Sequence, residues 1–243
     1  MVKNYLKKAT AGIALLAMSS FASADGHSEI SYSANLGFMS DYIYRGVHQS
    51  SSSAMGGFDI EYGSFYLGTW FADLQEDGWV AGSHRGFEYD VYAGFGFDLT
   101  DSVSGYVGYT IYRYTDKGAA AFDDDYDEVN VGVSFALTDD LSLSLDYSNG
   151  ENTLTDQSEV DYDILTTTIE YMGAYFTYGD WGVSEDDTGE TDAEYIEIGY
   201  SRTVGDFDLG GAFVLSEQEL AQASDTDEDG DFSRFVMTIS TGF

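Results

Sequence analysis

The sequence predicts an all-β fold: a closed, antiparallel up-and-down transmembrane β-barrel of about 12 strands. Three observations predict it. Apolar and polar residues alternate with a period of two along most of the chain. Short and long connections between these segments follow one another in strict order. The composition holds 28 glycines, 20 tyrosines and 16 phenylalanines but no proline, so no missing N–H interrupts a ladder of paired strands.

The first 24 residues have the features of a secretory signal peptide. Lys3, Lys7 and Lys8 form a basic head, residues 9–18 are apolar, and Ala22-Ser23-Ala24 is a small-residue cleavage site. We therefore expect a signal peptide over 1–24 and a single barrel domain over 25–243. No later segment holds the roughly 18 consecutive apolar residues of a membrane helix, so a membrane would be crossed by strands.

Charge and cysteine content exclude several classes of partner. The chain has 9 basic and 44 acidic residues, and removing the three lysines of the signal gives 6 − 44 = −38. Such a charge argues against nucleic acid as a partner. The absence of cysteine excludes disulfides, thiolate metal sites and a lipidated cysteine anchor. No cofactor is expected.

The strongest alternation runs from Phe87 to Leu99, where odd positions are apolar and even positions are polar or glycine. Residues 129–137 and 141–147 repeat it. Over 160–183 the pattern weakens, because Tyr162 and Ile164 lie on the face opposite to Leu165 and Ile169, and a β-bulge or register slip would explain this. The expected strands are 29–45, 54–62, 65–74, 85–98, 103–114, 126–137, 141–150, 160–171, 174–183, 193–203, 207–217 and 232–243.

The connections alternate in length. Tight turns are expected at 62–64, 100–101, 138–140, 172–173 and 204–206, and long loops at 46–53, 75–84, 115–125, 151–159, 184–192 and 218–231. In a meander, this order places all tight turns and both termini at one end. An even strand number with short periplasmic turns and long outer loops is typical of outer-membrane barrels, so we expect a location in the bacterial outer membrane.

Aromatic residues lie in two rows on the apolar faces, as in the girdles of membrane barrels. A periplasmic β-sandwich is the alternative, but its polar faces would be expected to carry more lysine than these do. The row at the turn end comprises Tyr62, Phe65, Phe97, Phe207 and Phe243, and the row toward the loop end comprises Phe71, Phe87, Tyr112, Tyr147, Trp181 and Phe235.

The chain ends in FVMTISTGF, inside an expected strand. A barrel closes by pairing its last strand with its first, so the chain can end where that seam ends. Phe235, Met237, Ile239 and Phe243 share the lipid face. This pattern resembles the assembly signal that bacterial outer-membrane proteins present to the barrel assembly machinery.

Motifs near the N-terminus carry a family resemblance. SDYIYRG (40–46) is followed by Gln49-Ser50, GGFDIEYG (56–63) and YLGTW (66–70). This region resembles the TorF-type porin family of proteobacteria, once grouped as conserved hypothetical proteins. The resemblance implies an outer-membrane barrel with channel activity and supplies no substrate. The family often has a tyrosine-rich strand ending in proline, whereas Thr115-Asp116 stands here, so the loop that follows is expected to differ.

Charged residues fall on the inward faces of the expected strands. Asp41 and Arg45 are about 13 Å apart along one strand and cannot pair, so Arg45 is expected to reach acids on other strands, with Asp59 and Glu61 as near candidates. Such charges either brace the wall as a buried ion network or form a constriction that filters solutes. The predicted pore-lining residues are Asp41, Arg45, Asp59, Glu61, Glu88, Asp90, Glu128, Asp146, Glu197 and Arg234.

These features favour an outer-membrane porin-like channel for passive diffusion of small solutes or ions. Twelve strands give a radius of about 12 Å, of which side chains fill half, so the pore is narrow or closed. Inward acids predict a preference for cations. The alternative is a non-transporting barrel that acts as an adhesin, receptor or structural protein. Expected partners are outer-membrane lipid, lipopolysaccharide, the assembly machinery, and small solutes or cations.

Neither an enzyme nor a strong metal site is predicted. The histidines are His27, His48 and His84, and although Ser83 adjoins His84, nothing fixes a catalytic triad. Asp225, Asp227, Asp229 and Asp231 are spaced like the start of a calcium loop, but the twelfth position is Val236 rather than glutamate, which excludes an EF-hand and leaves a weak Ca²⁺ candidate. The acidic loops are otherwise a solvated surface, or they bind divalent ions diffusely against lipopolysaccharide.

Overall fold

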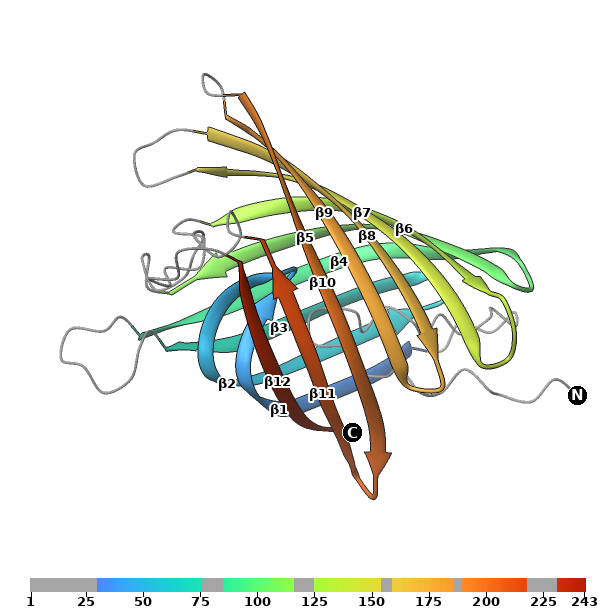
Figure 1. The fold of residues 1–243 in the computed structure, drawn as a ribbon. Coiled ribbons are helices and arrows are strands. Elements are labelled where there is room, and N and C mark those ends of the chain that lie inside the picture. The colour runs from blue at the N-terminus through green and yellow to red at the C-terminus, as the bar shows by residue number, and fades with distance from the viewer. Residues whose placement is uncertain (1–29, 76–84, 116–124, 154–158, 186–188, 218–230) are drawn as a thin grey trace, which may run out of the picture.

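Twelve strands form one antiparallel sheet that closes on itself, so the predicted 12-stranded barrel is confirmed (Figure 1). The structure, a computed structural model, describes residues 30–75, 85–115, 125–153, 159–185, 189–217 and 231–243. The expected signal peptide lies outside these residues. The strands are β1 Ile30–Tyr44, β2 Val47–Tyr62, β3 Phe65–Gln75, β4 Arg85–Thr100, β5 Val103–Tyr114, β6 Tyr126–Ala136, β7 Leu141–Thr153, β8 Glu159–Tyr171, β9 Ala174–Glu185, β10 Gly189–Val204, β11 Phe207–Ser216 and β12 Phe232–Gly242. In the described part of the chain, no helix has the length and apolar character to span a membrane.

The last strand closes the barrel against the first. β12 pairs with β1 from Asn35↔Gly242 to Met39↔Thr238, and Ala34 and Phe243 exchange two backbone hydrogen bonds of 2.9 and 3.0 Å. The expected seam at the C-terminus is therefore confirmed. Because every strand has two partners along this ring, the wall satisfies its own backbone groups, as a membrane interior requires.

The outer face is apolar. Phe235 and Met237 are 59% and 58% exposed, and Phe65, Phe207 and Phe243 of the turn-end row are also exposed. In the loop-end row, however, the placement of Tyr112 and Trp181 on the outside is wrong. Both lie inside the barrel, only 1% and 4% exposed. Their rings belong to a buried cluster in the lumen.

The expected irregularity over 160–183 is also absent. β8 pairs with β7 and β9 in unbroken register. Tyr162 and Ile164 point inward, whereas Leu165 and Ile169 are exposed outside. The alternation fails here because the inward residues join the buried cluster and are as apolar as the lipid-facing ones.

The prediction of a long first loop over 46–53 is wrong. β2 already begins at Val47, and a two-residue turn, Arg45-Gly46, joins it to β1. Both turn residues have positive φ, 49° and 83°, as a type I′ hairpin turn requires. A non-glycine residue with φ > 0 costs about 1–2 kcal/mol, so contacts of the Arg45 side chain must offset that cost.

The tip of this hairpin leaves the wall. β1 pairs with β12 only as far as Met39, and β2 pairs with β3 only from Met55 onward, although β1 and β2 stay paired to each other. We call residues 40–54 the lumen hairpin. A register shift after Tyr42 and a positive φ of 67° at Ser52 allow it to bend, and β1 and β2 curve away from the straight course of the other strands (Figure 1).

Two serines satisfy backbone groups where the lumen hairpin departs. Ser40 Oγ accepts a hydrogen bond from the Met237 N–H at 2.9 Å, and Ser53 Oγ donates one to the Asp73 carbonyl at 2.7 Å. These wall groups face the strand positions that β1 and β2 have vacated. The serines therefore remove the cost of leaving them unpaired in the wall.

Inward tyrosines lie across glycines of neighbouring strands, which accounts for the high content of both. Tyr66 on β3 is cross-strand to Gly94 on β4, which is in turn cross-strand to Gly108 on β5. A Cβ at Gly94 would overlap the Tyr66 ring and stand 2.5 Å from the Val107 carbonyl oxygen. The ring thus occupies the volume that side chains at both glycines would need.

We predict that Gly94→Ala lowers the free energy of unfolding by about 1–3 kcal/mol, the usual cost of overpacking. The matched control is Gly242→Ala, whose added Cβ would meet only the Ala34 carbonyl oxygen at 3.7 Å. Denaturant unfolding of both variants in detergent micelles measures the difference. Equal stability of the two variants would contradict this packing.

Candidate functional site

The lumen hairpin spans the barrel interior and contacts opposite walls. Tyr42, Tyr44 and Val47, all at most 3% exposed, join a cluster with inward residues of β3–β6 and β8–β10. Ile43 projects from the other side of the hairpin and packs with Val214, Phe232 and Val236 of β11 and β12. The hairpin therefore crosses the lumen instead of lying along one wall.

Arg45 at the tip inserts its guanidinium into a polar cage on the wall. Nη1 lies 2.7 Å from Glu128 Oε1, and Nη2 donates to Ser148 Oγ at 2.9 Å. Its Cζ atom lies 4.7 Å from the centroid of the Tyr44 ring, within the range of a cation–π interaction. Carboxylate, hydroxyl and aromatic face together match the planar, delocalised cation that arginine presents.

Three side chains of the wall also hold Glu128. Tyr162 donates to Oε1 at 2.8 Å, while Tyr112 and Asn130 donate to Oε2 at 3.1 and 2.9 Å. Asn130 also donates to Ser148 at 2.9 Å. The donors come from β5, β6 and β8, so wall side chains help to position the carboxylate that receives Arg45.

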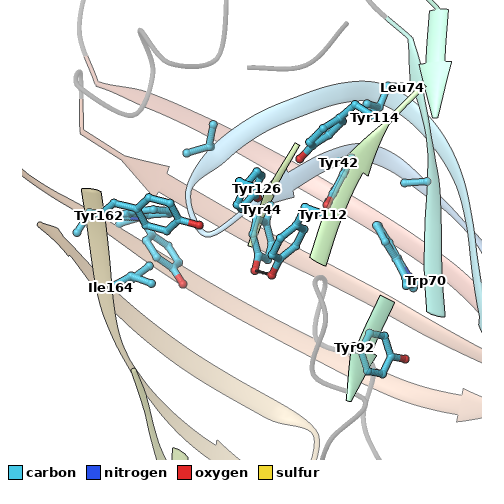
Figure 2. Close-up of a cluster of buried hydrophobic side chains, with 14 of the residues drawn as sticks. Tyr42, Tyr44, Trp70, Leu74, Tyr92, Tyr112, Tyr114, Tyr126, Tyr162 and Ile164 are labelled. Carbon is cyan, nitrogen blue, oxygen red and sulfur yellow. Dashed lines mark hydrogen bonds between the residues drawn. The ribbon is translucent and has the colours of Figure 1, made fainter. Parts of the chain in front are cut away.

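The hairpin tip also satisfies its backbone and hydroxyl groups against the wall. Trp181 Nε1 donates to the Arg45 carbonyl at 2.9 Å, and Ser216 Oγ donates to the Gly46 carbonyl at 2.7 Å. Figure 2 shows the hydroxyls of Tyr44 and Tyr112 joined by their 2.8 Å hydrogen bond, amid the buried tyrosines. These bonds remove the penalty of burying the tip.

An aromatic ladder lines the wall around the tip. Tyr112 stacks on Tyr126 at 4.4 Å, Tyr126 meets Tyr162 at 6.1 Å, and Tyr162 meets Trp181 at 5.6 Å between ring centroids. The ladder follows β5, β6, β8 and β9. The sequence-based prediction missed this ladder because it placed Tyr112 and Trp181 on the lipid face and considered inward positions mainly for their charge. The inward parity of Tyr126 and Tyr162 was the available signal.

Two further acids lie buried in the lumen beside this cage. Glu88 accepts a hydrogen bond from Tyr42 at 3.2 Å through Oε1 only. Asp90 is 0% exposed, and within the described residues neither of its carboxylate oxygens, nor Oε2 of Glu88, has a hydrogen-bond partner. Asp90 is cross-strand to Trp70 and Tyr112. The interior therefore holds more carboxylates than Arg45 can neutralise.

Four of the other predicted pore-lining acids each accept a hydrogen bond from a hydroxyl group. Asp59 accepts from Tyr92, Asp146 from Tyr106 at 2.9 Å, and Glu197 from Tyr175. Glu61 accepts from Ser31 at 3.3 Å. Arg234 lies on β12 with its Cζ atom 5.9 Å from the Phe232 ring centroid.

The expectation for Arg45 was thus right in kind and wrong in detail. Arg45 does reach an acid on another strand, but it is Glu128 rather than Asp59 or Glu61. Arg45 is a turn residue of the lumen hairpin, not an inward residue of the wall. The expected partners of Arg45 were chosen as if β1 were straight, but β1 bends after Tyr42 and carries Arg45 away from Asp59 and Glu61.

Most candidates for a catalytic or metal site lie outside the described residues. Asp41 Oδ1 lies 3.6 Å from His48 Nε2, outside hydrogen-bond distance, and the contact bridges the two strands of the hairpin. His27, Ser83, His84 and the calcium candidates Asp225, Asp227 and Asp229 lie outside the described residues, whereas Asp231 lies just before β12. Within the described ranges, no three His, Asp or Glu side chains are grouped to hold a metal ion.

We predict that Arg45→Ala lowers the free energy of unfolding by about 3 kcal/mol, because it leaves the buried Glu128 charge without its cation. Arg113→Ala is the matched control. Arg113 forms ion pairs with Asp125 and Asp127 at 3.7 and 3.1 Å, all partly exposed, so its loss should cost less than about 1 kcal/mol. Denaturant titration in detergent compares them, and equal losses would argue against a buried charge pair.

Comparison with known proteins extends these findings. A family model described as "Bacterial protein of unknown function (Gcw_chp)" matches residues 23–243. None of the curated proteins compared with the chain matches it. Among solved structures, the KdgM porin superimposes with a TM-score of 0.52 at 12% identity, over 87% of this chain and 99% of that one. The NanC porin does so with a TM-score of 0.51 at 11% identity, over 88% and 99%. At such low identity, the likeness is one of fold.

Proposed function

This chain belongs to the Gcw_chp family of bacterial proteins, whose function is unknown, and we propose that it is a porin-like outer-membrane channel that passes small cationic solutes or ions. The observation that carries the proposal is the division between the two faces of one closed wall. Exposed phenylalanines cover the outside, and carboxylates line the inside. A barrel in water would not expose such a surface, whereas a lipid bilayer requires it.

The charge of the lumen supports cations as the solute class. Glu128 pairs with Arg45, Glu88 and Asp90 are buried in the same lumen, and Asp59, Asp146 and Glu197 add further acidic groups on the inward face. Rings of acids favour cations in pores. A KdgM structure with the same fold was determined in complex with disordered oligogalacturonate, an acidic sugar chain. An acid-rich lumen disfavours such a solute, so the fold that this chain shares with KdgM does not imply the same transported solute.

Location and partners follow from the same surface. We infer an outer-membrane location, with lipid and lipopolysaccharide around the wall and the assembly machinery as the partner that reads Phe235, Met237, Ile239 and Phe243. All four side chains are exposed on or beside the last strand. The N-terminal motifs support assignment to the TorF-type porin family, which remains part of this proposal. No catalytic role is proposed.

We predict cation-selective conductance in planar bilayers. Under a KCl gradient, the reversal potential should move toward the potassium equilibrium potential, because lumen carboxylates raise the local cation concentration. Wild type should conduct weakly. A variant in which Asn-Gly replaces residues 40–52, closing the Met39↔Ser53 pair with a type I′ turn, should conduct more. Anion preference, or no conductance from either protein, would refute the channel.

A non-transporting barrel is the second candidate, and the lumen hairpin is the observation that favours it. A structural or receptor protein has no need of an open lumen, and a hairpin packed against opposite walls stabilises a filled one. The same recordings separate the two. A barrel that stays silent after the hairpin has been shortened is a structural or surface-binding protein.

A further inference from the structure

We propose that the cage occupied by Arg45 is a binding site for a small guanidinium-bearing solute, and that the lumen hairpin blocks this site with its own guanidinium until such a solute displaces it. The inference rests on the proposed channel function and names the solute class. It also gives the hairpin a role: a tethered competitor for the site.

The site belongs to the wall and not to the hairpin. Besides Arg45, Glu128 accepts hydrogen bonds from Tyr112, Tyr162 and Asn130, and Ser148 accepts one from Asn130, so these donors all belong to the wall. A departing hairpin would remove Arg45 and the Tyr44 ring but leave an oriented carboxylate, a hydroxyl and the aromatic ladder. Preorganised acceptors of this kind bind a planar cation without first having to be ordered.

The contacts of Arg45 define the ligand chemistry. One guanidinium edge reaches both Glu128 and Ser148, at 2.7 and 2.9 Å, which requires two N–H donors in a fixed fork. A spherical inorganic cation has no such fork. Glu88 and Asp90 lie buried in the same lumen, and carboxyl oxygens of both have no hydrogen-bond partner among the described residues, so a solute that donates N–H groups finds further acceptors there. The carboxylate of Glu128 favours a cation over a neutral solute.

The hairpin is built so that it can leave. Residues 40–54 form no backbone ladder with β12 or β3. The preceding part of β1 pairs with β12, and the following part of β2 pairs with β3. Its hold on the β3–β9 side of the lumen depends on Arg45, on Tyr42 and Tyr44, and on the Trp181 bond to the Arg45 carbonyl. Exchange of one guanidinium for another therefore removes the main polar contact and supplies its replacement.

Titration calorimetry of the purified full chain in detergent tests the site, with methylguanidinium chloride as the probe and methylurea as its neutral counterpart. Wild type should bind methylguanidinium and not methylurea. Arg45→Gln should bind it at least about tenfold more tightly, because the competitor is gone. Arg45→Lys should be intermediate, and Glu128→Gln should not bind. Arg113→Gln changes partly exposed contacts with Asp125, Asp127 and the carbonyls of Tyr112 and Tyr126, and it should match wild type.

Bilayer recordings on the same proteins link binding to opening. Methylguanidinium should raise the potassium current of wild type at least about threefold, toward the current that Arg45→Gln carries without the probe. Methylurea should leave the wild-type current unchanged. Heat-modifiable mobility on a denaturing gel checks that each variant has folded.

The two readouts separate the two proposals. Equal affinity of wild type and Arg45→Gln, or equal binding of methylurea, overturns the site while leaving a cation-selective channel intact. Binding as expected with no current from any variant overturns the channel and leaves the site.

Discussion

The structure depends on one constraint: a membrane interior offers no partner to a backbone N–H or C=O group. Each strand must therefore pair on both sides, and the sheet must close, which is why β12 pairs with β1. The same constraint determines where residues 40–54 go. A hairpin with two unpaired edges cannot remain among lipids, so it folds into the lumen, and Ser40 and Ser53 satisfy the wall groups beside it.

Filling the lumen then decides the chemistry of the inward face. The wall has to accept a two-stranded ribbon, which requires flat rings and small residues rather than a purely polar lining. On the β3–β5 side, the Tyr66 ring lies over Gly94 and Gly108, which have no side chains to project into the lumen. Tyr112, Tyr126 and Tyr162 give rings for the hairpin to pack against and hydroxyls to bind the buried acids.

A buried ion pair connects the lumen hairpin to the wall. A carboxylate such as Glu128 is costly inside a protein unless it is paired and hydrogen-bonded, and it has both kinds of partner here. Only one of its partners, Arg45, lies on the lumen hairpin. In the proposed exchange, the choice between a filled and an open lumen would therefore depend on this one guanidinium–carboxylate pair.

What the sequence determined by itself was the wall. The two-residue period, the alternating turns and the terminal FVMTISTGF predicted strand number, closure and most of the residues that face lipid, because lipid and lumen impose opposite polarity on successive residues. The fate of residues 46–53, the inward position of Tyr112 and Trp181, and the pairing of Arg45 with Glu128 were decided only by the tertiary structure. Alternation of apolar and polar residues indicates which face of the strand a residue lies on, but not whether that part of the strand pairs within the wall. Glu128 meets Arg45 only because the closed ring brings β6 opposite a hairpin 83 residues away in sequence.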